Sequence, residues 1–113
     1  MISKNMGRID WNKPAAEIER LVRAMNPWPS AWTILDGRIL KIWKAHIEKP
    51  ELTGTPGTTG RIVRQDARGF YIQTAQGILV PEEIQLEGRK RMAASEFLKG
   101  FIIRNNDLTK EKQ

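Results

Sequence analysis

The chain has 113 residues, with 19 Lys and Arg against 13 Asp and Glu, one His and no Cys. This length fits a single domain with a modest hydrophobic core. The absence of Cys excludes a disulfide framework, a thiolate nucleophile and a Cys-based zinc site, and the lone His46 excludes a histidine cluster for a metal. The net charge of +6 makes the chain a candidate for binding a polyanion, but charge alone is explained at least as well by a solvated surface that aids solubility.

Targeting and membrane signals are lacking in the sequence. The first eleven residues are polar and basic, without the apolar stretch of a signal peptide. The longest apolar runs, such as Phe101-Ile102-Ile103, are far shorter than the roughly 18 residues needed to cross a bilayer. We therefore expect no membrane partner and a cytoplasmic protein, because a chain without Cys is compatible with that compartment.

The first predicted element is a helix over residues 15–25. Asn12 can cap its start, and Pro14 fits its first turn. Glu19 and Arg23 are four residues apart and should form an ion pair on its flank. The apolar residues recur at helical spacing and form one stripe: Ile18, Leu21, Val22 and Met25.

Short strands separated by turn signals follow this helix. Asp36-Gly37 is typical of a two-residue hairpin turn. Residues 49–60, rich in Pro, Gly and Thr, should form a loop. The predicted strands cover residues 31–35, 38–48, 60–65, 70–75, 78–80 and 83–86. A final helix should begin at Ser95 as its cap, with an apolar stripe of Phe97, Leu98, Phe101 and Ile102.

The strand predicted over 38–48 has no uniformly apolar face. Strict alternation places Lys41 and Trp43 on one face and Lys44 and His46 on the other. We therefore expect this strand to bend around a barrel. The pattern as a whole predicts a mainly β fold with flanking helices, a small antiparallel barrel or sandwich preceded by an N-terminal helix, and an open barrel of the OB type is compatible with it.

Catalytic chemistry finds little support in the residues. His46 has no obvious partner and is better explained as a partly buried structural residue than as a base. Glu82 and Glu83 should point to opposite faces of a strand as solvated charges. The four Trp residues are more consistent with a core than with base stacking. The run Arg89-Lys90-Arg91 suits phosphate oxygens and a solvated loop equally well.

Taken in order, the motifs resemble one family over residues 2–104. The stretches that match it are Arg8-Ile9-Asp10-Trp11-Asn12, Asn26-Pro27-Trp28-Pro29, Ala31-Trp32-Thr33, Leu40-Lys41-Ile42-Trp43, Pro56-Gly57-Thr58, Gly77-Ile78-Leu79 and Ile84-Gln85-Leu86-Glu87-Gly88-Arg89-Lys90-Arg91-Met92. The chain resembles the C-terminal domain of methionyl-tRNA formyltransferase. Residues 105–113 form a polar tail that we expect to be frayed. The resemblance implies a linker remnant (1–11) and a domain over residues 12–104 that is an OB-like, open, antiparallel Greek-key barrel preceded by an N-terminal helix. It also implies that Ile2-Ser3-Lys4 ends an interdomain linker and that Met1 is a start added to a fragment.

The resemblance further implies a division of labour within a longer enzyme. That enzyme formylates the methionyl group on initiator tRNA with 10-formyltetrahydrofolate in an N-terminal Rossmann-like domain, of which this chain has no part. The chain itself is then expected to be inactive and to hold no cofactor or metal. Its expected partners are initiator methionyl-tRNA and the N-terminal catalytic domain of the same enzyme.

The family's tRNA-facing surface is basic, and this implies a set of candidate residues here. They should contact phosphates and sugars without reading sequence. The candidates are Arg38, Lys41, Lys44, Arg89, Lys90 and Arg91, with Arg61 and Arg64 as weaker ones. Trp28 and Trp32 are assigned to the core. One alternative is a structural module that docks on the catalytic domain and has little tRNA affinity. A complete small enzyme is a third and poorly supported hypothesis.

Overall fold

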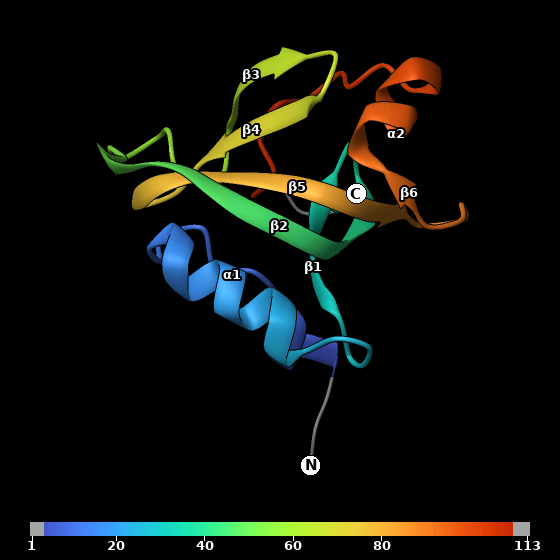
Figure 1. Cartoon of the computed structure of the whole chain (residues 1–113), viewed down its shortest axis with the longest axis horizontal. Helices are drawn as coiled ribbons and strands as arrows, with labels where there is room; N and C mark the ends of the chain where they lie inside the picture. The colour runs from blue at the N-terminus through green and yellow to red at the C-terminus, as the bar shows by residue number, and fades with distance from the viewer. Residues whose placement is uncertain (1–3, 110–113) are drawn as a thin grey trace.

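A six-stranded antiparallel sheet forms the centre of the computed structural model, which describes residues 4–109. The strands pair in the order β1-β2-β5-β4-β3, and β6 pairs with β5. Figure 1 shows the long strands β2 and β5 side by side in the middle, with α1 below them and the β3–β4 hairpin above. The elements are a 3-10 helix Lys4–Gly7, α1 Ala15–Ala24, β1 Ala31–Leu35, β2 Arg38–Thr53, β3 Ile62–Asp66, β4 Gly69–Gln73, β5 Gln76–Leu86, β6 Met92–Ala93 and α2 Ala94–Gly100.

The sheet does not close on itself, and helices flank it. The prediction of a mainly β, open, antiparallel barrel-like fold with a leading helix is therefore confirmed. Helix α1 packs on β2 and β5 through Ile18 and Val22, which are buried in the same core as the strands. Fully burying an aliphatic side chain of this size stabilises a fold by about 1.5–3 kcal/mol. The predicted apolar stripe is thus what fixes α1 to the sheet.

Both predicted helix caps are wrong. Helix α1 has Pro14 in the cap position without a side-chain cap, and the amide oxygen of Asn12 instead accepts a hydrogen bond from the Thr59 hydroxyl at 2.8 Å. Helix α2 begins at Ala94 and Ser95 lies inside it. The reason is that β6 pairs with β5 and leads directly into α2, so no capping residue precedes the helix.

The two central strands, β2 and β5, are longer than predicted. The first hairpin matches the prediction, with φ of +49° at Asp36 and +77° at Gly37. Strand β2, however, continues to Thr53, and β5 is one strand from Gln76 to Leu86 rather than two. Pro81 lies within β5, where the ladder to β2 shifts its register, and a proline is tolerated at such an irregularity.

Residues at both ends of the described chain pack into the barrel. The Trp11 indole N–H donates to the Thr33 hydroxyl at 2.9 Å, and that hydroxyl donates to the Leu108 carbonyl at 2.9 Å. The Leu108 N–H donates to the Gly60 carbonyl at 2.8 Å, and its side chain is only 1% exposed. The predicted frayed tail is therefore wrong for residues 105–109, and its remainder lies outside the described residues, as do Ile2 and Ser3 of the predicted linker.

Two apolar residues predicted to be inside lie on the surface. Trp28 is 63% exposed, because the turn after α1 buries Pro29 and Ser30 and leaves the indole outside. Trp32 is buried as predicted. Ile102 is 81% exposed, because α2 ends at Gly100 and the extended backbone that follows takes residue 102 off the helical stripe.

Candidate nucleic-acid interface

A bulge in β2 places Lys41, Trp43 and Lys44 on the same side of the strand. The ladder to β5 shifts its register on either side of Lys44, which leaves Trp43 as an extra residue. Ile42 and Ala45 are consequently both buried although they are three positions apart. The prediction that Lys41 and Lys44 lie on opposite faces is wrong, because strict alternation holds only where the register is unbroken.

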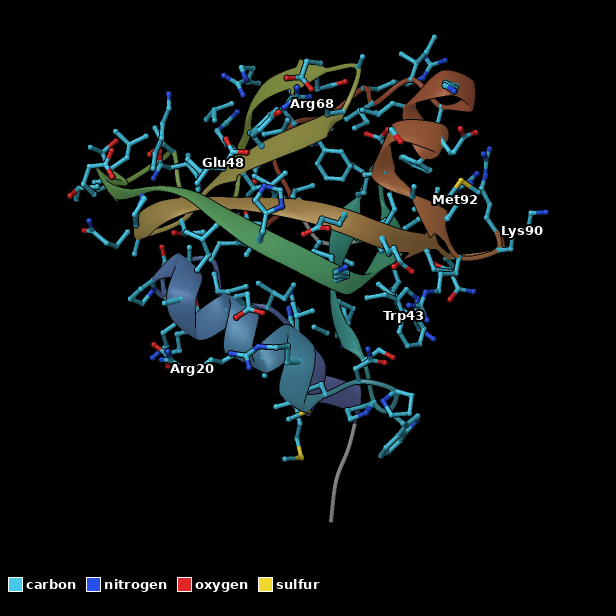
Figure 2. The ribbon with its side chains drawn as sticks, in the orientation of Figure 1. Arg20, Trp43, Glu48, Arg68, Lys90 and Met92 are labelled. Atoms are coloured by element: carbon cyan, nitrogen blue, oxygen red, sulfur yellow. The ribbon has the colours of Figure 1, made fainter. Side chains whose placement is uncertain are left out.

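The basic run lies on a loop, residues 87–91, next to this part of β2. Lys41 lines a groove of about 250 Å³ together with Gln85, Glu87 and Gly88. The Glu87 N–H donates to the Ile39 carbonyl at 2.8 Å, and the Ile39 N–H donates to the Glu87 carboxylate at 3.0 Å, so the start of the loop is tied to β2. Figure 2 shows Lys90 extending outward from the loop, away from the sheet.

A second groove lies between α1 and β2. It has a volume of about 410 Å³ and brings together Arg23, Lys44 and Arg91, with Trp43 in its wall. Arg23 was predicted only as the ion-pair partner of Glu19, although the helical periodicity of α1 could have shown that Arg23 lies on the side that faces β2. We call Lys41, Lys44, Arg89, Lys90 and Arg91 the basic face.

Carboxylates compensate only part of the basic face. The Arg91 guanidinium lies 2.8 Å from Glu83, whereas the Lys44 ammonium is 3.9 Å from Glu82. Arg89 lies over the Phe101 ring, 5.3 Å from its centroid. Among the residues that the structure describes, no carboxylate forms an ion pair with Lys41, Arg89 or Lys90. These three cations are therefore the ones available to an outside anion.

Three predicted site residues lie apart from the basic face. Arg38 begins β2 and, by strand alternation, points to the opposite side. Arg61 is 3.7 Å from Asp107. Arg64 lies over the ring of Tyr71, 3.9 Å from its centroid, and this partner raises the pKa of Arg64 further above its usual value. The structure thus gathers five of the eight predicted residues and separates Arg38, Arg61 and Arg64 from them.

His46 has partners that the sequence did not reveal. Its Nδ1 lies 2.9 Å from a Glu82 oxygen and its Nε2 lies 3.1 Å from a Glu48 oxygen. Partial burial lowers the pKa of His46, but the hydrogen bonds and charges of Glu48 and Glu82 outweigh this and raise it above its usual value. The ring is half-exposed, and both of its nitrogens are engaged, so the prediction that His46 has no obvious partner is wrong.

The described residues offer neither a metal centre nor a membrane helix. Between residues 4 and 109, no group of three or more His, Asp or Glu side chains could hold a metal ion. Within the same range, no helix is long and apolar enough to cross a membrane. Glu82 and Glu83, predicted as solvated charges on opposite faces, have different partners, His46 and Arg91 respectively.

Comparisons with known proteins agree with the resemblance found in the sequence. The family model for the formyl transferase C-terminal domain matches residues 1–102. The methionyl-tRNA formyltransferases of Agathobacter rectalis and Lachnospira eligens are 48% and 46% identical to the chain, which they cover to 91% and 88%. The chain spans about a third (32%) of the length of each.

The fold also occurs in a protein of different name. A structure of HypX from Aquifex aeolicus in complex with tetrahydrofolic acid has a TM-score of 0.62 to this chain at 23% identity. The match covers 88% of this chain and 18% of HypX, and at this level of identity it shows a shared fold alone. The family match and the bacterial relatives go further than this likeness: the chain belongs to the formyl transferase C-terminal domain family.

Proposed function

We propose that this domain is the tRNA-binding part of a methionyl-tRNA formyltransferase and that its basic face contacts the phosphates of initiator methionyl-tRNA. The observation that supports this most directly is the β2 bulge, which places Lys41 and Lys44 beside the loop that presents Lys90. Relatives named methionyl-tRNA formyltransferase make tRNA the polyanion to expect.

The chemistry of the basic face suits backbone contact rather than base reading. Lys ammonium and Arg guanidinium groups bind phosphate oxygens, and such contacts orient a nucleic acid without specifying its sequence. Folded RNA is recognised largely by the shape and spacing of its phosphates and 2′-hydroxyls. The domain would then hold the tRNA while a separate N-terminal domain transfers the formyl group from 10-formyltetrahydrofolate. The isolated chain is accordingly proposed to be inactive.

A binding experiment across a salt series tests this function. Initiator tRNA should bind more tightly than an unrelated duplex RNA of similar size, and affinity should fall steeply with salt. Reversing charge with Lys41→Glu and Lys90→Glu should weaken binding at least tenfold. Arg68→Glu is the matched control, because Arg68 is an exposed cation on the β3–β4 turn, away from the basic face (Figure 2). Equal losses from all three variants would refute a localised binding surface.

The exposed Trp28 favours a second function, docking on the catalytic domain. Trp28 is 63% exposed, and Trp side chains are enriched at protein–protein interfaces because they supply a large apolar contact area. In this alternative, Trp28→Ala weakens the association between the chain and a separately produced catalytic domain from a relative, and Lys90→Glu does not. If neither change alters association while Lys90→Glu abolishes tRNA binding, the docking alternative fails.

A further inference from the structure

The basic run does not consist of three equivalent cations. Arg91 directs its Nε and one terminal nitrogen to a single oxygen of Glu83, each at 2.8 Å. The guanidinium also lies over the Trp43 ring, 4.7 Å from its centroid. The charge of Arg91 is therefore neutralised and its plane is held between two neighbours, whereas Lys90 has no ion-pair partner among the described residues.

The same Trp43 is linked to the loop by a second route. Its indole N–H donates to the Gln85 side-chain oxygen at 3.1 Å, and the Gln85 amide donates to the Arg89 carbonyl at 3.0 Å. The Arg89 N–H in turn donates to the Leu86 carbonyl at 2.8 Å. Trp43 thus contacts the loop through Gln85 on one side of Lys90 and through Arg91 on the other.

We infer that Trp43, Glu83, Gln85 and Arg91 form a clamp that positions loop 87–91, and that Arg91 is a positioning residue rather than a phosphate contact. This inference rests on the proposed RNA-binding function. The clamp adds to the hydrogen bonds that tie Glu87 to β2, because Gly88, with φ of +84°, has open space where a Cβ would stand and leaves the tip of the loop little packing. By holding both sides of Lys90, the clamp keeps Arg89 and Lys90 where the unpaired charge can meet phosphates.

The bulge in β2 explains why Trp43 can act in this way. As the extra residue of the bulge, Trp43 lies beside the ladder positions of Glu83 and Ile84. Its ring therefore lies where the Arg91 side chain returns toward Glu83, just before β6 pairs with β5. Without the extra residue, alternation would turn either Trp43 or Lys44 into the core.

Two conservative substitutions separate positioning from charge. Lys90→Arg keeps an exposed cation and should bind initiator tRNA within twofold of the unchanged chain. Arg91→Lys also keeps the charge but loses the planar fork on Glu83 and the stacking on Trp43. It should weaken binding at least threefold, and the amide hydrogens of residues 87–91 should exchange with solvent at least tenfold faster. If Arg91→Lys changes neither affinity nor exchange, the clamp is refuted.

A double substitution tests whether the clamp acts through Lys90. In a Lys90→Gln background, Arg91→Lys should weaken binding by less than 1.5-fold, because the positioned charge is already gone. Lys44→Gln is the control, since Lys44 is on the basic face but outside the clamp, and its effect should be unchanged by Lys90→Gln. A full loss from Arg91→Lys in that background would make Arg91 a direct contact and overturn the inference.

Amide exchange keeps the two proposals distinguishable. If the unchanged chain binds no RNA at low salt, the proposed function fails, yet the exchange rates of Arg91→Lys and Lys90→Arg still decide the clamp. Trp43→Phe supplies a milder change, since it keeps a ring under Arg91 but removes the hydrogen bond to Gln85. It should speed exchange in the loop less than Arg91→Lys does, and the reverse order would contradict the arrangement.

Discussion

The buried Leu108 gives the sharpest test of the fold, because the sequence around it is polar. Its side chain is 1% exposed, its N–H donates to the Gly60 carbonyl, and its carbonyl accepts from the Thr33 hydroxyl. Truncating it with Leu108→Ala removes three buried carbon groups, one methine and two methyls, and leaves a cavity under the tail. Buried Leu→Ala changes cost about 2–5 kcal/mol, so we expect about 3 kcal/mol here.

A loss of this size is readily measured. It is a large part of the roughly 5–15 kcal/mol that stabilises a typical domain. Melting followed by circular dichroism should show a midpoint lower by about 10 °C, and urea unfolding should give the same loss at an unchanged slope. Ile102→Ala is the control, since Ile102 is 81% exposed in the same segment and should change stability by less than about 0.5 kcal/mol. Equal effects from the two variants would refute the packing of residues 105–109.

Three further changes test other features of the structure. Trp28→Ala should change the free energy of unfolding by less than about 0.5 kcal/mol, whereas Trp11→Ala, which empties a buried site, should lower it by about 3–5 kcal/mol. A larger loss from Trp28→Ala than from Trp11→Ala would contradict the assigned burial. The pKa of His46 is raised, so its contacts with Glu48 and Glu82 stabilise the fold at pH values below its ordinary pKa, and this stability is lost as the pH rises through the raised pKa. His46→Gln should therefore destabilise the fold more at pH 6 than at pH 8, by less than about 1 kcal/mol because the ring is half-exposed. An NMR titration in which Glu82→Gln fails to lower the midpoint of His46 would count against this. In Gly54→Ala the added methyl group would overlap the backbone carbonyl of Thr74, so the free energy of unfolding measured in urea should fall by more than about 1 kcal/mol. An unchanged free energy would show that the loop can shift to make room.

Local patterns predicted the elements that depend on neighbouring residues alone. The turn at Asp36-Gly37 requires positive φ at both positions, and this residue pair favours that conformation, so the hairpin was predictable. The helix that packs through Ile18 and Val22 was predictable for the same reason. Leu108 was not, because its burial depends on partners that lie 48 and 75 residues away in the chain and leave no local trace.

The site was predictable in its residue types but not in its arrangement. Strict alternation along β2 assumes an unbroken register. The bulge at Trp43 places Lys44 and Ala45 each on the face opposite to the one that alternation predicts. A sequence shows that Arg91 is a cation, but it cannot show that Glu83 lies 2.8 Å away. The resemblance to a family with a basic surface therefore added Arg61 and Arg64 as weaker candidates, although carboxylates 3.7 and 3.8 Å away accompany those two arginines.

The distinction between paired and unpaired cations sets the salt dependence that the domain should show. Each phosphate contact contributes about 0.7–0.9 to the slope of log affinity against log salt. If all eight predicted residues met phosphates, the slope would be about −6 to −7. If only the cations of the basic face that form no ion pair with a described carboxylate do so, namely Lys41, Arg89 and Lys90, the slope is about −2 to −3. Titrating initiator tRNA at four or more salt concentrations separates the two, and an intermediate slope of about −3.5 to −4.5 would mean that Arg91 and Lys44 exchange their carboxylates for phosphates on binding.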